Sequence, residues 1–192
     1  MLIEFSIPLL PIGGQKERLG EFFLKMRREE YLMQGRAVAV CRGAEKGKRK
    51  GAVLTGFFQK GVGLVGDAHA GTDKEVSLLL KERVDELAGK TGYSFPAGAF
   101  AENLLVEGLK WAECTPGKYL KAGEAVLQIT QIGKDPAIPH SYNYCGFSLL
   151  PRFGIFAKVI ESGTIRNGDT IAILDQSAAN HRGEAHESQP AR

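Results

Sequence analysis

The stretch GEAVLQITQ at residues 123–131 guides the interpretation of the whole fold. A glycine, which permits a tight turn, precedes a run rich in apolar and β-branched residues, and this combination is typical of a strand after a hairpin turn. Short apolar runs bounded by glycine recur over residues 36–174, and the chain has 24 glycines among its 192 residues. The sequence therefore predicts many short strands separated by turns.

The runs with the composition of strands account for most of residues 36–174. They lie at residues 37–41, 53–58, 76–80, 104–106, 119–120, 125–132, 155–160 and 170–174. Residues 117–123 and 163–168 are expected to form hairpin turns, and residues 81–88 a short helix with Val84 and Leu87 on its buried side. The predicted fold class is mainly β, a closed or nearly closed sheet with a few short helices on its rim.

Two segments flank this β-rich region, which spans residues 36–174. Residues 1–35 are expected to be an N-terminal extension with an amphipathic helix over residues 14–33, ending at Gly35. The apolar face of that helix either packs against the domain or forms a dimer contact. Residues 175–192 are polar and small without periodicity, so a disordered tail is expected there.

The composition argues against several classes of protein. The net charge is only +3, and the basic segment KGKRK at residues 46–50 is interpreted as a solvated hairpin tip, so no nucleic-acid partner is expected. Three scattered cysteines are too few for a disulfide framework and do not have zinc-site spacing. No apolar run resembles a signal peptide or reaches the length of a bilayer span, which favours a cytoplasmic location and no membrane partner.

The loop GLVGDAHAG at residues 63–71 has the strongest local signal for a binding site. Gly66 and Gly71 permit backbone conformations that other residues rarely adopt, so the N–H groups of the loop can approach an anion. Asp67 can orient His69 through a ring nitrogen, which would leave His69 to donate to a phosphate or to act as an acid or base. The alternative is that Asp67 caps the turn and His69 satisfies backbone carbonyls.

Several segments, in the same order, resemble the MOSC domain, the family named for the C-terminal domain of molybdenum cofactor sulfurase. They are GDAHAG (66–71), EVSLL (75–79), FAENLLVEGL (100–109), GEAVLQITQ (123–131), PRFGIFAKV (151–159) and GTIRNGD (163–169). The chain is most similar to small stand-alone bacterial forms over about residues 36–174. The resemblance implies a β-barrel, and it implies that Gly66, Asp67, His69 and Gly71 line a cofactor pocket.

Three further residues suit an anionic ligand in this interpretation. Asn103 can both donate and accept hydrogen bonds, so it either contacts the ligand or only locks a loop beside the pocket. Arg152 offers a fork of donors that matches a phosphate or carboxylate, and the alternative is a surface ion pair. Lys134, just after the strand that ends near Gln131, is another candidate for binding the anion.

The resemblance also implies a reactive thiol, and here the chain departs from the family pattern. Family members usually carry a cysteine about five residues after the position of Gln131, where a thiolate would bind molybdenum or carry sulfur. This chain has Pro136 there, which offers no ligand atom. Cys145, further along the same loop, can take the role of catalytic thiol or metal ligand. The alternative is that Cys145 is an inert small hydrophobe.

The resemblance implies a protein that binds molybdenum cofactor or carries sulfur for chemistry linked to it. Its partner would be the cofactor itself or a molybdenum-cofactor enzyme. The family includes cofactor-dependent reductases of N-hydroxylated compounds, but Pro136 argues against that chemistry here. Pyridoxal phosphate binding belongs to a separate domain of the full-length sulfurases and is a family label only. The alternative function is a catalytically degenerate barrel that serves as a binding or scaffold module for a molybdenum- or sulfur-pathway partner, with the N-terminal helix as docking face.

Overall fold

The computed structural model of the chain describes residues 34–134 and 142–174. The expected N-terminal helix, the C-terminal tail and Pro136 lie outside these residues, so the expectations about them stay predictions. No helix in the described part of the chain is long and apolar enough to span a membrane.

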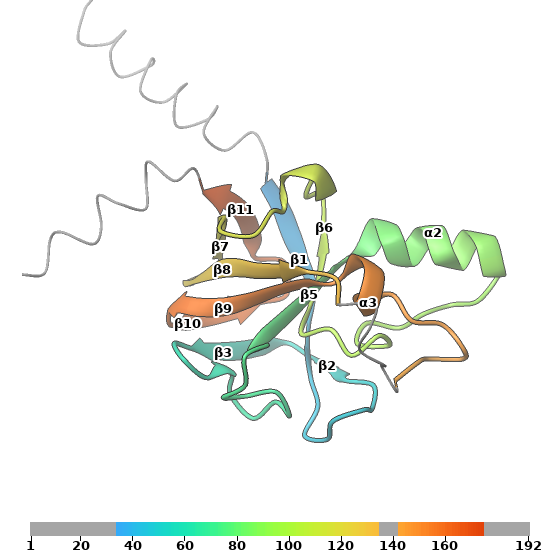
Figure 1. The fold of residues 1–192 in the computed structure, drawn as a ribbon, viewed down its shortest axis with the longest axis horizontal. Coiled ribbons are helices and arrows are strands. Elements are labelled where there is room, and N and C mark those ends of the chain that lie inside the picture. The colour runs from blue at the N-terminus through green and yellow to red at the C-terminus, as the bar shows by residue number, and fades with distance from the viewer. Residues whose placement is uncertain (1–33, 135–141, 175–192) are drawn as a thin grey trace, which may run out of the picture. The chain divides into compact units, whose positions relative to one another are not determined.

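Seven strands pair in a ring and form a closed barrel (Figure 1). Around the ring they are β11 (Thr170–Leu174), β7 (Tyr119–Ala122), β8 (Ala125–Ile132), β9 (Ile155–Glu161), β5 (Val76–Leu80), β6 (Leu104–Glu107) and β1 (Gln34–Arg42). Pairing of β1 with β11 closes the ring. Neighbours are antiparallel except β5 and β6, whose crossover contains helix α2 (Lys81–Thr91). The predicted closed, mainly β fold is confirmed.

The barrel interior is filled by alternate residues of its strands, because successive side chains of a strand point to opposite faces. Leu120, Leu127, Ile129, Ile155 and Ile171 are among its buried members. The register between β8 and β9 shifts twice, and such bulges bend strands in the way that closure requires. The predicted strands therefore bury one continuous apolar core.

A smaller sheet closes one end of this core. It consists of β10 (Gly163–Arg166), β3 (Thr55–Gln59) and β4 (Gly63–Leu64), and its inward side chains belong to the barrel core. Two predictions are wrong here. The run at 53–58 is not one strand, because the exposed Leu54 separates β3 from β2 (Gly51–Val53), which pairs with β1. The predicted turn at 163–168 mostly forms β10.

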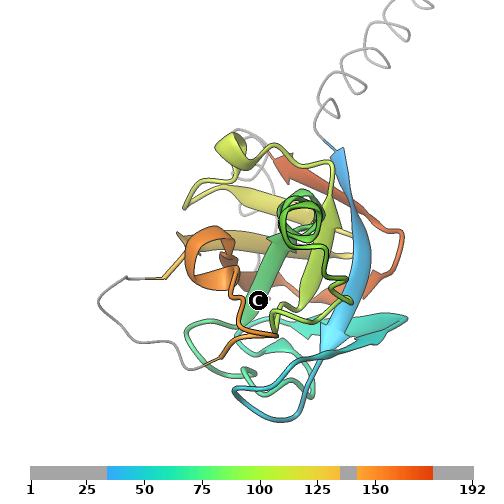
Figure 2. The ribbon, with the colours of Figure 1, turned by 90° about the vertical axis from the view of Figure 1, so that its right-hand side faces the viewer.

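A second apolar cluster lies on the outer faces of β1, β5, β6 and β9. It is covered by α2, by the loop before β6 and by the short helix α3 (Leu150–Phe153), and Figure 2 shows both helices on this side of the barrel. The predicted helix at 81–88 is confirmed, with Val84 buried in this cluster. All residues of β5 are buried because both faces of that strand are covered. The segments before β5, before β6 and between β8 and β9 carry the candidate site residues.

Gly35 lies inside β1, where it pairs with Ile171, so the expectation that it ends a helix is wrong. A Cβ atom at Gly35 would lie 2.4 Å from the backbone oxygen of Glu107 in β6. Glycine at this position therefore permits the close approach of β1 and β6.

Candidate functional site

The glycine loop of residues 65–72 folds into consecutive tight turns. Gly66 and Gly71 have φ values of +79° and +74°, in the left-handed region that favours glycine. However, the backbone N–H groups of residues 67–72 all donate within the protein, at 2.7–3.2 Å, to backbone carbonyls or to the Asp67 carboxylate. The expectation that these N–H groups lie open to an anion is therefore wrong.

Asp67 organises the loop from inside, together with a lysine that the sequence did not indicate. Its Oδ1 accepts a hydrogen bond from Lys50 Nζ at 2.9 Å, and its Oδ2 accepts one from the Gly43 N–H at 3.1 Å. The side chains of Lys50 and Asp67 are 2% and 0% exposed. The hairpin-tip interpretation fits Lys48, whose side chain is 67% exposed, but it is wrong for Lys50.

The charge state of this pair follows from its surroundings. Burial opposes ionisation of Asp67, but its interactions with His69 and Lys50 outweigh burial and hold the pKa of this carboxyl well below its usual value. Burial lowers the pKa of Lys50, and the Asp67 charge opposes that shift. We therefore treat Asp67 and Lys50 as an ionised pair inside the protein.

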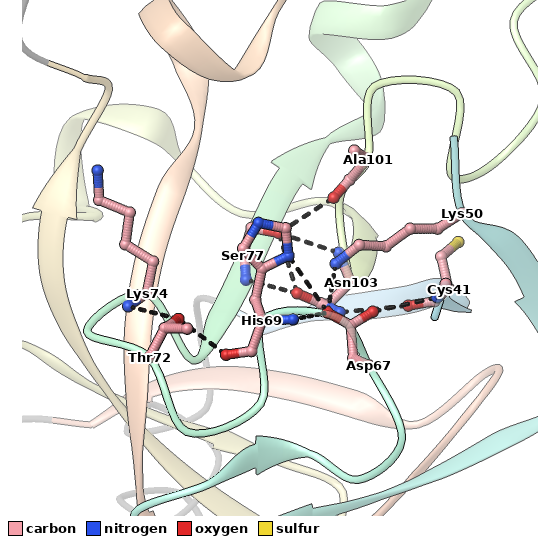
Figure 3. Close-up of polar contacts among 10 residues, drawn as sticks. Cys41, Lys50, Asp67, His69, Thr72, Lys74, Ser77, Ala101 and Asn103 are labelled. Atoms are coloured by element: carbon pink, nitrogen blue, oxygen red, sulfur yellow. Dashed lines mark hydrogen bonds and ion pairs between the residues drawn. The ribbon is translucent and has the colours of Figure 1, made fainter. Parts of the chain in front are cut away.

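His69 lies beside this pair (Figure 3). Its Nδ1 is 3.5 Å from Asp67 Oδ1, but this buried nitrogen makes no hydrogen bond with the part of the chain that the structure describes. The ring is 35% exposed, so one side of it reaches solvent. The predicted proximity of Asp67 and His69 is thus present, while the predicted orienting hydrogen bond is not formed.

Asn103 is fully buried and uses its side chain to join strands. Its Oδ1 accepts from the N–H and the hydroxyl of Ser77 at 3.1 and 3.0 Å, and its Nδ2 donates to the Cys41 carbonyl at 3.4 Å (Figure 3). These bonds tie the segment before β6 to β5 and β1. The sequence left two roles open for Asn103, contact with the ligand or locking of a loop beside the pocket. These hydrogen bonds favour the second role.

Glu102, next to this lock, is 1% exposed and receives the N–H groups of Gly98 and Phe100 at 2.6 and 3.1 Å. Burial raises the pKa of Glu102, while those N–H groups and the Lys50 charge oppose the rise. No pattern in the sequence indicated that two carboxylates and one lysine would be buried close together.

Lys134 and Arg152 are brought onto adjacent segments. The Gly133 N–H donates to the Gly154 carbonyl at 2.7 Å and the Lys134 N–H to the Pro151 carbonyl at 2.8 Å, which fixes the end of β8 against α3. Arg152 is exposed, and its guanidinium lies 5.1 Å from the Phe153 ring centroid. The structure therefore places the backbone of these two predicted cationic residues on adjacent, hydrogen-bonded segments.

Lys134 and a second lysine, Lys74, both lie against the ring of Phe156. Lys134 is half-buried, and both its Nζ and that of Lys74 lie near the ring of Phe156, at 5.9 and 5.4 Å from the centroid. Burial lowers the pKa of Lys134, and the charge of Lys74 lowers it further.

A short chain of contacts leads from Lys74 to His69. Thr72 Oγ1 accepts from the Lys74 N–H at 3.3 Å and donates to the His69 carbonyl at 2.8 Å. In Figure 3 the Lys74 side chain extends away from the His69 imidazole. The backbone groups of His69 and Lys74 are thus linked through the Thr72 hydroxyl.

Cys145 lies at an exposed turn. It has φ +51° and Gly146 has φ +83°, and two backbone hydrogen bonds between Tyr144 and Phe147 close the turn. Both aromatic rings contact Phe95, at centroid distances of 6.3 and 5.8 Å, and so anchor the turn. Cys145 is exposed, so it does not resemble the inert buried cysteines that act as small hydrophobic residues.

The other two cysteines are buried, as expected of structural residues. Burial raises the pKa of Cys41 to about 12 and that of Cys114 to about 11. In residues 34–134 and 142–174, no group of three or more His, Cys, Asp or Glu side chains has a geometry that could hold a metal ion.

Comparison with known proteins gives the same fold. Residues 65–136 match the family model described as the MOSC domain. The structure is similar to that of YuaD from Bacillus subtilis, with 17% identity, a TM-score of 0.58, and coverage of 75% of this chain and 98% of that chain. It is also similar to YiiM from Geobacillus stearothermophilus, with 20% identity, a TM-score of 0.56, and coverage of 74% and 76%. YiiM from Escherichia coli gives 19% identity, a TM-score of 0.52, and coverage of 73% and 70%. No curated protein sequence matches the chain.

Proposed function

We propose, from the premise that residues 65–136 match the MOSC domain, that the chain binds molybdenum cofactor, or carries sulfur for chemistry linked to that cofactor. The anionic part of the cofactor is held by Lys134 and Arg152, and the thiol is that of Cys145. The buried residues of the glycine loop and Asn103 then act by fixing the backbone around the site, without contacting the ligand.

The observation that carries the proposal is the attachment of the end of β8 to α3, which holds Lys134 and Arg152 on adjacent segments. Within the described residues, neither cation forms an ion pair with a carboxylate. A lysine supplies a point charge and an arginine a planar fork of donors, and phosphate groups are commonly bound by this combination. In that part of the chain, both charges are thus available to compensate an anionic ligand.

The residues present fit the anionic portion of the cofactor better than its metal. Lys134 and Arg152 match a phosphate, and Cys145 offers an accessible thiol as a soft ligand. When bound, the cofactor would supply the redox chemistry of molybdenum. The chain itself would bind and orient the phosphate. Asp67 and Asn103, being fully occupied inside the protein, would not take part in that contact.

The test is binding of molybdenum cofactor to the purified chain, followed by metal analysis. We expect Lys134→Met/Arg152→Met to bind the cofactor at least about tenfold more weakly, because each charge-assisted hydrogen bond contributes roughly 1.5–3 kcal/mol. The matched control Lys48→Met/Arg36→Met removes two exposed cations elsewhere and should bind like the wild type. Equal binding by both double variants would reject the cationic site.

The variant Cys145→Ser tests whether the Cys145 thiol binds molybdenum or carries sulfur. If Cys145 is a metal ligand or sulfur carrier, the serine variant retains phosphate-dependent binding but loses molybdenum or a persulfide detectable by mass spectrometry. Unchanged molybdenum content and an unchanged sulfur state would remove Cys145 from the function.

The alternative function, a degenerate barrel that binds a protein partner, is favoured by Pro136 at the position of the usual family cysteine. It predicts that the wild-type chain does not bind the cofactor under the same conditions. It also predicts that deletion of residues 1–33, which stops short of β1, abolishes capture of a molybdenum- or sulfur-pathway protein.

A further inference from the structure

We propose that Lys74 and Lys134, whose ammonium groups both lie within 6 Å of the Phe156 ring centroid, form a subsite for a dianionic oxyanion of the phosphate type. The subsite deepens the proposed function and rests on it for one source of that anion, the phosphate of the cofactor. The other source is free inorganic phosphate.

The register of the sheet shows how two distant lysines reach one ring. Phe156 in β9 pairs with Ser77 in β5 on one side and with Gln131 in β8 on the other. Both neighbouring strands run antiparallel to β9, so Lys74, before β5, and Lys134, after β8, approach the ring from opposite ends. Their long side chains both reach this ring, since each ammonium group lies within 6 Å of its centroid.

The Phe156 ring itself explains part of why the two lysines lie near it. Phe156 is 3% exposed, so the apolar stems of the lysines are suited to cover it while their ammonium groups stay near water. Each ammonium also lies within the distance at which a cation is attracted to an aromatic ring. These contacts account for one lysine above Phe156, but a second lysine adds repulsion between like charges.

This repulsion is not relieved by neighbouring acids in residues 34–134 and 142–174. Glu75 lies next to Lys74 in sequence, but its Oε2 accepts the Val159 N–H at 2.9 Å. Asp73 is exposed, and within these residues no ion pair joins it to either lysine. In this part of the chain, the lysine pair therefore has no carboxylate to neutralise it.

Other lysines of this chain are arranged differently. Lys48, Lys81, Lys90 and Lys110 each lie within 4.0 Å of a carboxylate three or four residues away. By contrast, Lys134 is half-buried and shares the Phe156 ring with Lys74, so its charged form is disfavoured both by burial and by the Lys74 charge. A dianion between the two ammonium groups would offset both costs, whereas a monoanion would leave one charge uncompensated.

The experiment measures binding of inorganic phosphate to the full chain by calorimetry at constant ionic strength. Lys74→Met and Lys134→Met remove one charge each but retain an apolar stem over Phe156. Each should weaken phosphate binding at least about tenfold, as expected for loss of a charge-assisted contact. The control Lys60→Met removes an exposed lysine elsewhere and should bind as the wild type does. Acetate should not compete.

A second measurement tests the repulsion without any ligand. In phosphate-free buffer, each methionine variant at 74 or 134 should have a midpoint of thermal unfolding equal to or above that of the wild type. Added phosphate should raise the wild-type midpoint more than that of either variant. A wild type that does not bind phosphate, or a Lys74→Met variant that binds it equally well, would overturn the subsite.

The outcomes also distinguish this inference from the proposed function. If phosphate binding depends on both lysines but molybdenum cofactor does not bind, the subsite stands and free phosphate is its ligand. If the cofactor binds through Lys134 and Arg152, and neither cofactor binding nor phosphate binding is weakened by Lys74→Met, the subsite is wrong while the proposed function stands.

Discussion

Lys50 and Asp67 form an enclosed ion pair, with 2.9 Å between Nζ and Oδ1 and side chains that are 2% and 0% exposed. Lys50 follows the turn between β1 and β2, and Asp67 lies in the glycine loop. The pair therefore ties these two loops together. Its two charges depend on one another, because a buried charge without its partner is costly whereas removal of both charges is often tolerated.

Lys50→Met should accordingly reduce the free energy of unfolding by about 3–5 kcal/mol at neutral pH, since it leaves the Asp67 carboxylate buried and unpaired. The double variant Lys50→Met/Asp67→Asn should recover much of this loss, because the asparagine is uncharged. Urea unfolding of the full chain measures both.

The control is Lys48→Met, which removes a lysine of the same turn whose ammonium pairs with Glu45 at the surface. Its stability should stay close to that of the wild type. If Lys50→Met costs no more than Lys48→Met, the buried pair does not hold the loops together.

The two buried carboxylates should respond to pH in opposite directions. The folded pKa of Asp67 lies below its ordinary value of 3.8, so its stabilising contribution is present above that pH and is lost as the pH falls further. The folded pKa of Glu102 lies above its ordinary value of 4.5, so its contribution is present below that pH and is lost as the pH rises through the folded pKa.

Unfolding curves between about pH 3 and pH 7 measure this difference against the wild type. The deficit of Asp67→Asn should shrink as the pH falls below 3.8, while the deficit of Glu102→Gln should grow as the pH falls from neutral towards 4.5. Deficits that change in the same direction would show that the assigned shifts are wrong.

The three thiols should differ sharply in reactivity. Cys145 is exposed, whereas burial raises the pKa of Cys41 to about 12 and of Cys114 to about 11, so their thiolates are scarce at neutral pH. A thiol reagent at about pH 7.5 should modify one cysteine per native chain and all three after denaturation. Cys145→Ser should abolish the native reaction, and a remaining fast thiol in that variant would contradict the assignment.

The fold was predictable because its signals are local. Bounding glycines and apolar runs marked β8 (Ala125–Ile132) and β11 (Thr170–Leu174) with the same bounds as the structure gives. The break between β2 and β3 was missed because Leu54, an apolar residue, occupies it without a glycine or proline. β10 was missed because its flanking glycines suggested a turn.

The candidate site was predictable only in part, because its contacts join distant segments. Asp67 and His69 are near in sequence and were found together. Lys50 was missed because no local pattern shows that a lysine at the end of a basic run turns inward to Asp67. Lys74 was missed because its meeting with Lys134 depends on the register of β9 between β5 and β8.

Two glycines with similar backbone angles should tolerate alanine very differently. Gly71 has φ +74°, and within the described part of the chain nothing lies within 4 Å of the point that a Cβ atom would occupy. Gly71→Ala should therefore cost only the left-handed conformation, about 1–2 kcal/mol. Gly98 has φ +81°, and a Cβ there would lie 2.2 Å from the Lys50 carbonyl oxygen, which forces the backbone around Lys50 to move.

Gly98→Ala should therefore cost at least about 2 kcal/mol more than Gly71→Ala, in the range of overpacked interiors. It should also disturb Lys50, because the Lys50 N–H donates to the Gly98 carbonyl at 3.0 Å. Combining Gly98→Ala with Lys50→Met should consequently cost less than the sum of the two single changes, whereas Gly71→Ala should add to Lys50→Met independently. Urea unfolding measures all of these variants, and equal costs for the two alanine substitutions would show that residues 50 and 98 do not approach so closely.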